Sequence, residues 1–151
     1  MGRIFESMSA FFDADDWSYE VLPGGSILRM GFSGADGQWT CFAQAREAEE
    51  QFVFYSVAPF KTPEERRLPM AEFITRANYN MIIGNVELDL QDGEVRYKTA
   101  LDVQGTELSH ALMKGLVYAN VLTMDRYFKG ILAVAFGGVD ASRAAAGIED
   151  G

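Results

Sequence analysis

The sequence contains one cysteine, Cys41, and one histidine, His110, in 151 residues. A single cysteine cannot form an internal disulfide, which is typical of proteins that stay in a reducing cytoplasm. One cysteine and one histidine also cannot complete a structural zinc site within the chain. Because histidine is the side chain that titrates near neutral pH without perturbation, little is present for acid–base catalysis. We therefore expect a cytoplasmic, non-enzymatic protein without a metal or other cofactor.

Long apolar runs and an excess of positive charge are missing as well. The longest apolar stretch, residues 130–138, is about half as long as a bilayer-spanning helix. The first residues contain no uninterrupted apolar segment of signal-peptide length. The formal net charge of -9 repels phosphate backbones and anionic lipid head groups. Nucleic acids and membranes are therefore not expected as partners.

Apolar side chains, in contrast, are abundant. Hydrophobic residues make up 48% of the chain, with 11 Phe, 6 Tyr and 2 Trp, which is enough for one core and for an interface besides. No repeat or linker separates two domains. We expect a single domain over residues 1–140, followed at 141–151 by a short C-terminal helix or tail that Asp140 caps.

The first half of the chain predicts one helix and then a meander of strands. Apolar residues at spacings of one, three and four indicate a short helix at the N-terminus; they are Ile4, Phe5, Met8, Phe11 and Phe12. From residue 17 to residue 58 the apolar period changes to two. A two-residue turn at Asp36-Gly37 would place Phe32 opposite Cys41 and Met30 opposite Ala43.

A second hairpin is predicted around Asp92-Gly93, which separates two alternating runs. A two-residue turn there places Asp89 opposite Arg96 and Glu87 opposite Lys98 on the solvent face. On the buried face the same turn places two apolar pairs, Leu90 with Val95 and Leu88 with Tyr97.

The remaining segments predict helices. Thr62 and Pro63 indicate a helix start, but Pro69 favours a short turn first and a main helix from Pro69 onward. Its inner stripe would consist of Met70, Phe73, Ile74 and Ala77. A second long helix is predicted over residues 106–128, with Gly130 interrupting it before a short piece at 131–136. Its inward residues would be Leu108, Ala111, Leu112, Ala119 and Leu122, with Val117, Val121 and Met124 widening the stripe.

Two stretches, residues 76–89 (RANYNMIIGNVELD) and 118–127 (YANVLTMDRY), resemble the YbjN family of bacterial proteins. The resemblance covers residues 3–140 and includes Gly37-Gln38-Trp39-Thr40-Cys41 and the hairpin around Asp92-Gly93. It implies an α+β fold like that of type III secretion chaperones, a twisted antiparallel sheet with helices packed on one face. It also implies a role among sensory transduction regulators, and dimers that hold segments of partner proteins.

Searching for catalytic chemistry yields one alternative. Ser109 and His110 are adjacent, and adjacent helical residues point about 100° apart, so they do not form a nucleophile and its base. The acidic clusters around Asp13 and Glu47 lack the spacing of a calcium loop. The alternative to protein binding is a small-molecule sensor or minor enzyme with a pocket near Cys41 and His110.

Two sets of residues are candidates for partner binding. Residues 51–58 are apolar on both strand faces, so a second subunit or a long loop would cover the face that the helices leave open. The contacts would be Phe52, Phe54, Tyr55 and Phe60. Asn78, Tyr79 and Asn120 lie near predicted helix ends, where they form a polar recognition patch or, as the alternative, cap helices and turns. The leading hypothesis is a homodimer that binds a protein segment.

Overall fold

Six antiparallel strands form one sheet in the order β1-β2-β3-β4-β6-β5. The structure is a computed structural model and describes residues 2–149. The strands are β1 (Tyr19–Val21), β2 (Ile27–Ser33), β3 (Gln38–Arg46), β4 (Gln51–Lys61), β5 (Asn85–Leu88) and β6 (Glu94–Asp102). The helices are α1 (Arg3–Ala14), the 3-10 turn η1 (Glu64–Arg66), α2 (Arg67–Asn78), α3 (His110–Phe136) and α4 (Ala141–Glu149).

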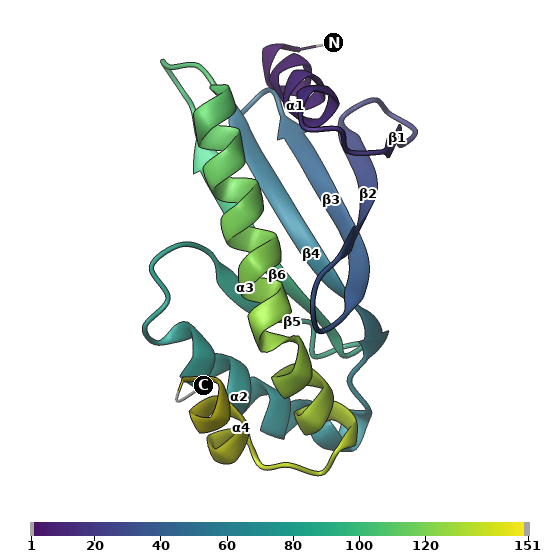
Figure 1. The fold of residues 1–151 in the computed structure, drawn as a ribbon, viewed down its shortest axis with the longest axis vertical. Coiled ribbons are helices and arrows are strands. Elements are labelled where there is room, and N and C mark those ends of the chain that lie inside the picture. The colour runs from purple at the N-terminus through teal and green to yellow at the C-terminus, as the bar shows by residue number, and fades with distance from the viewer. Residues whose placement is uncertain (1, 150–151) are drawn as a thin grey trace.

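The helices pack on one face of the sheet, as the α+β prediction requires. Helix α3 runs diagonally across that face, and α1 lies beside it near the β1 edge of the sheet (Figure 1). Helices α2 and α4 pack against each other and against α3, and α2 also contacts the edge strand β5. The core lies between these helices and the inward side chains of the sheet.

Helix α1 confirms the prediction at the N-terminus. All five apolar residues of its predicted stripe are buried. Its first turn is held by Glu47, whose carboxylate accepts hydrogen bonds from the backbone N–H of Ile4 at 3.1 Å and of Phe5 at 2.8 Å. A carboxylate at this position satisfies N–H groups that have no partner within the helix. Its negative charge also interacts favourably with the positive end of the helix dipole.

The β2–β3 hairpin differs from the prediction by two residues in register. Met30 lies opposite Cys41, and Phe32 lies opposite Trp39. The predicted pairs of Phe32 with Cys41 and of Met30 with Ala43 are therefore wrong. Because the shift is an even number of residues, every side chain keeps its predicted face, and Met30 and Cys41 are both buried.

Helix α3 explains why this turn is longer than expected. The chain reverses over four residues, 34–37, which a 2.8 Å hydrogen bond from the Gly34 N–H to the Gly37 carbonyl closes. The Asp125 carboxylate of α3 accepts hydrogen bonds from the N–H groups of Ala35 at 3.0 Å and Asp36 at 2.9 Å. A side chain distant in sequence thus stabilises a turn that local residues alone do not specify.

The β5–β6 hairpin shows the same kind of shift. Glu87 lies opposite Arg96, and Leu88 lies opposite Val95. The predicted pairs of Asp89 with Arg96, Glu87 with Lys98, Leu90 with Val95 and Leu88 with Tyr97 are therefore wrong. Leu90, predicted to be buried, lies in the turn and is exposed.

Contacts with the segment before α2 hold the longer turn of this hairpin. The Thr62 N–H donates to the Gly93 carbonyl at 2.8 Å, and the Lys61 ammonium pairs with Asp92 at 2.8 Å. The Arg67 guanidinium lies against the carbonyls of Leu90 and Gln91. These long-range contacts favour a turn that extends over residues 90–93, with the Asp89 N–H bonded to the Glu94 carbonyl.

The segment after β4 follows the prediction closely, since a short 3-10 turn precedes the main helix α2. The four residues predicted for its inner stripe are all buried. The helix begins at Arg67 rather than Pro69, which places the proline within the first turn, where a missing N–H costs nothing. Thr62 does not cap this start, since its hydroxyl is buried and without a hydrogen-bond partner in the part of the chain described.

Helix α3 is one continuous helix of 27 residues, capped by the Ser109 hydroxyl, which accepts from the Leu112 N–H. The predicted interruption at Gly130 is wrong, because this glycine packs closely against Phe73 and Ile148. Much of the predicted inward face is also wrong, since Leu112 and Leu122 are exposed. The buried stripe contains Met113, Val117, Asn120, Val121, Met124, Tyr127, Phe128, Ile131, Val134 and Ala135.

Helix α4 confirms the predicted C-terminal helix. The Asp140 carboxylate accepts a 2.8 Å hydrogen bond from the Arg143 N–H, which is the predicted cap. The last residues of the predicted tail, 150–151, lie outside the described part of the chain. The division of the chain at residue 140 stays a prediction.

Candidate functional site

The central strand β4 places its candidate residues on two opposite faces. Phe52 and Phe54 point toward the helices and are fully buried in the core. Their side chains therefore offer no surface to a partner. Tyr55 and its neighbours Val53 and Val57 lie on the other face, which the described helices leave uncovered.

Charged side chains shield much of this uncovered face. The Arg96 guanidinium lies 4.2 Å from the centre of the Tyr55 ring. Glu87 pairs with both Arg96 at 2.7 Å and Lys98 at 2.9 Å. Val53 is only 7% exposed, although no helix covers it. Long side chains of the sheet itself therefore cover part of this face.

Phe60 lies near the end of β4 and is half-buried. Its ring contacts Phe128 at 6.2 Å and Phe136 at 5.3 Å between centroids, both edge to face. Phe136 itself is exposed at the end of α3. Phe60 thus helps to fix the end of α3 against the sheet.

Asn120 is a core residue rather than part of a surface patch. It is fully buried, and its amide nitrogen donates to the Phe54 carbonyl at 2.9 Å and lies 3.2 Å from both the Tyr97 carbonyl and the Thr99 hydroxyl. Its side-chain oxygen accepts from the Ser56 hydroxyl at 2.6 Å. This network joins α3 to β4 and β6. Asn120 therefore has a structural role, which was the alternative to a polar recognition patch.

Asn78 also has a structural role, at the last residue of α2. Its amide nitrogen donates to the Val86 carbonyl at 3.0 Å, and its side-chain oxygen accepts from the Val86 N–H at 2.8 Å. Val86 belongs to β5, an edge strand whose alternate residues point their N–H and C=O groups away from the sheet. The Asn78 amide therefore occupies a position that another strand would use for pairing.

Cys41 and His110 are not brought together. Cys41 is fully buried on β3, where burial raises the pKa of its thiol to about 11 although the Ser56 hydroxyl contributes a hydrogen bond in the opposite sense. His110 is exposed at the start of α3, with its ring 4.9 Å from that of Phe11. The structure thus shows no pocket shared by these two residues in the part of the chain described.

The loop between α2 and β5 exposes a group of large apolar side chains. Tyr79 is 85% exposed, Ile82 is 90% exposed and Ile83 is 52% exposed. Leu122, on the neighbouring part of α3, is 59% exposed. Adjacent exposed side chains of this size are characteristic of surfaces that bind other molecules.

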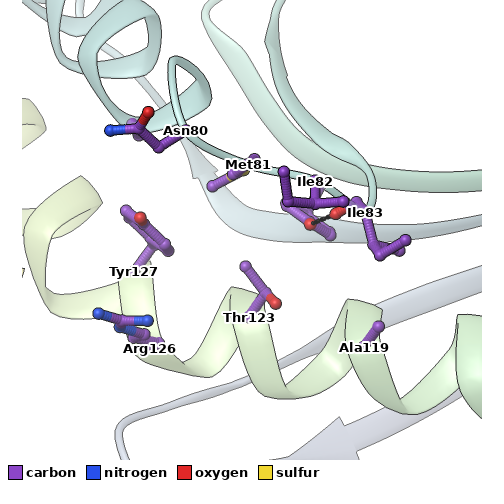
Figure 2. A pocket seen from close by; sticks show the side chains of 10 residues that line it. Asn80, Met81, Ile82, Ile83, Ala119, Thr123, Arg126 and Tyr127 are labelled. Carbon is purple, nitrogen blue, oxygen red and sulfur yellow. Dashed lines mark hydrogen bonds between the residues drawn. The ribbon is translucent and has the colours of Figure 1, made fainter. Parts of the chain in front are cut away.

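A groove of about 610 Å³ separates this loop from α3. Its walls consist of Ala77, Asn80, Met81, Ile82, Ile83, Tyr97, Ala119, Thr123, Arg126 and Tyr127. Figure 2 shows the loop residues on one side of the hollow and the α3 residues, spaced one turn apart, on the other. Tyr79 and Asn80 continue the surface toward α4, where they border a second hollow with Arg76.

Gly84 and Tyr97 fix the loop above the groove. Gly84 has a φ of +76°, and a side chain there would collide with the Lys98 carbonyl and the Tyr97 hydroxyl. A glycine is therefore required on both conformational and steric grounds. The Tyr97 hydroxyl donates to the Ile83 carbonyl, and burial raises the pKa of this phenol, so it stays a donor.

Of the residues that the sequence suggests for a polar patch, Tyr79 borders this surface and Asn80 lines the groove. Met81, Ile82, Ile83 and Thr123 escaped the sequence reasoning. The available signal was the apolar run Met81-Ile82-Ile83 in a connection between a helix and a strand, since connections are usually polar.

Within residues 2–149, no group of three or more His, Cys, Asp or Glu side chains is arranged to hold a metal ion. No helix in this range combines the length and apolar character needed to cross a bilayer.

The fold and groove define an α+β domain with a hollow of mixed polar and apolar lining between α3 and the loop that leads to β5. The sequence matches the YbjN family, described as "Putative bacterial sensory transduction regulator", over residues 5–133. Since this match includes most of the chain, the chain belongs to the YbjN family. No curated protein matches the chain.

Solved structures show the same fold at low sequence identity. The crystal structure of YbjN from E. coli matches with a TM-score of 0.63 and 14% identity, covering 80% of this chain and 84% of that one. The HopA1-SchA chaperone-effector complex matches with a TM-score of 0.50 and 13% identity, covering 82% and 92%. The Yersinia pestis type III secretion chaperone SycH, in complex with a fragment of YscM2, has a TM-score of 0.49 and 12% identity, covering 78% and 93%. The family and the α+β fold predicted from sequence are confirmed.

Proposed function

We propose that this protein is a non-enzymatic, chaperone-like regulator that binds a segment of another protein in the groove between residues 79–84 and α3. The observation that carries the proposal is the exposure of Ile82 beside a hollow whose walls combine apolar and polar side chains. Burying an isoleucine side chain stabilises a complex by about 1.5–3 kcal/mol. A partner that covers both Ile82 and Ile83 would gain about this amount for each.

The state of the sheet edge favours one mode of binding. An extended peptide can add a strand to an exposed edge, or a segment can dock its side chains into a groove. The Asn78 amide already bonds the N–H and C=O of Val86 on β5. Docking of side chains into the groove is therefore the mode that we propose on this side of the molecule.

The likeness to a chaperone in a chaperone-effector complex supports the proposal at the level of fold. We further propose that the protein is a homodimer and acts in the cytoplasm. The exposed apolar loop supports self-association, because it offers a surface that two copies can bury together. The buried thiol of Cys41, with its raised pKa, suits a protein that keeps its cysteine reduced.

Peptide display tests the groove directly. A random peptide library is selected on the whole protein and counter-selected on Ile82→Asp, which places a charge at the groove without disturbing the core. We expect a set of peptides that bind the native protein and lose affinity for Ile82→Asp. Val21→Asp, on the exposed edge strand β1, is the matched control and should retain binding.

Two results would contradict these proposals separately. If no peptide is enriched on the native protein over Ile82→Asp, the groove does not bind protein segments. If light scattering gives a monomer mass at micromolar concentrations, the homodimer is wrong, while segment binding is still judged by the display experiment.

A further inference from the structure

The groove contains a single charged side chain among its walls, that of Arg126. We infer that the bound segment presents a carboxylate next to aliphatic residues, and that Arg126 binds this carboxylate. The inference rests on the proposed function, because it specifies the chemistry of the segment that the groove would hold.

The position of Arg126 suits this role. It lies on α3 one turn beyond Thr123, and Figure 2 shows it below Tyr127, at the end of the groove where Asn80 lies on the opposite side. Its guanidinium is 6.0 Å from the centre of the Tyr127 ring and donates a long hydrogen bond of 3.4 Å to the Ile148 carbonyl. These contacts orient the side chain while leaving it at the surface.

The chemistry of the guanidinium selects the ligand. Arginine presents a planar fork of N–H donors that matches the two oxygens of a carboxylate. Where a bound segment covers the groove, such a pair is less exposed to water and therefore stronger than on an open surface. The Thr123 hydroxyl and the Asn80 amide, which also line the groove, can donate to the same carboxylate.

The net charge of the chain favours a different ligand from Arg126, since a net charge of -9 attracts basic segments from a distance. At physiological salt, however, charges more than about 8 Å apart are largely screened. The distant acidic residues therefore influence the encounter, whereas Arg126 determines which charge is tolerated inside the groove. An acidic residue flanked by leucine, isoleucine or valine can pair with the guanidinium while its neighbours contact the apolar side chains of the loop, Met81, Ile82 and Ile83.

Charge reversal provides the test. The same random peptide library is selected in parallel on the native protein and on Arg126→Glu. We expect Asp or Glu beside aliphatic residues in peptides from the native protein, and Lys or Arg at the corresponding position in peptides from the variant. For an acidic peptide from the native selection, Arg126→Gln should raise the Kd about tenfold. Replacing its acidic residue by the amide should remove most of that difference.

Lys129→Glu is the matched control, because Lys129 is an exposed cation of α3 that pairs with Asp36 and does not line the groove. It should leave the acidic preference unchanged. Selected peptides without an acidic preference, or the same preference on Arg126→Glu, would overturn the inference and leave the proposed function standing. Failure to enrich any peptide over Ile82→Asp would overturn both.

Discussion

The Ser56 hydroxyl donates a 2.6 Å hydrogen bond to the side-chain carbonyl of Asn120, and both residues are fully buried. The amide nitrogen of Asn120 completes the connection by bonding to the Phe54 carbonyl. Helix α3 is therefore positioned on the sheet by polar bonds as well as by packing. Buried polar groups of this kind are costly when a partner is removed.

Replacing Asn120 by alanine should destabilise the protein by about 2–4 kcal/mol, because it leaves buried polar groups unsatisfied and opens a small cavity. Urea unfolding followed by circular dichroism measures the change. The control is Asn80→Ala, at an exposed position, which should change the free energy of unfolding by less than about 0.5 kcal/mol. Equal effects of the two substitutions would show that the network contributes nothing beyond the loss of an amide.

Replacing Asn78 by alanine should have two effects. The loss of both hydrogen bonds to Val86 should lower the free energy of unfolding by about 1–2 kcal/mol. It also leaves the edge of β5 open to pairing, so we expect association that increases with protein concentration in light scattering. Asn85→Ala is the matched control, because it removes an amide from β5 itself and leaves the bonds between Asn78 and Val86 in place. If Asn78→Ala has the same mass as the native protein at every concentration, the amide does not protect the edge.

The ion pairs of Glu87 predict a specific dependence of stability on pH. Burial raises the pKa of this carboxyl, but hydrogen bonds from Lys98 and Arg96 together outweigh it, so the pKa lies below its ordinary value. A pKa lowered in the folded state stabilises the protein above the ordinary carboxyl pKa of about 4.3, and this contribution disappears as the pH falls through the folded pKa. The native protein should therefore lose more stability on acidification than Glu87→Gln does.

Urea unfolding at several pH values between neutral and strongly acidic conditions checks this prediction. The gap between the native protein and Glu87→Gln should be present at neutral pH and shrink at acid pH. Glu65→Gln, at an exposed position of η1, removes the same charge and controls for the overall charge of the chain. A gap that is constant across the pH range would contradict the role of these ion pairs.

The thiol of Cys41 should react slowly in the folded protein. Because burial raises its pKa to about 11, the thiolate is roughly a hundredfold scarcer near neutral pH than for a thiol with the ordinary value of 9.0. The raised pKa also means that this group stabilises the fold below pH 9 and that the contribution is lost as the pH rises toward 11. Labelling with a thiol reagent, compared in native buffer and in urea, measures the difference. Fast labelling in native buffer would point to the alternative of a reactive pocket.

The two hairpins show how much of the sheet could be predicted from the sequence. Alternation of apolar residues assigns a side chain to a face, and those assignments survived at Met30 and Cys41 although the register was wrong by two. The register itself depends on turns that distant residues stabilise, Asp125 in one hairpin and Arg67 in the other. Neither contact can be derived from the local sequence.

Helix α3 and the groove show where prediction from sequence was limited. The helix is apolar around much of its circumference, so the predicted inward stripe included Leu112 and Leu122, which are exposed, and omitted Met113, which is buried. The asparagines were noticed because of their chemistry, yet Asn78 and Asn120 form bonds inside the fold. The exposed Ile82 became apparent only when the loop was seen in three dimensions.

Helix α3 touches all three of the other α-helices: α1, α2 and α4. We expect a continuous helix of this length to couple the packing of α1 to that of α4, because both helices pack against it and a sharp kink would break its backbone hydrogen bonds. Trimming α4 should therefore loosen α1 as well, although the two lie at opposite ends of the chain (Figure 1). Protection of backbone amides from hydrogen exchange would then decrease in α1 and near α4 together, and the molecule would unfold as a single cooperative unit.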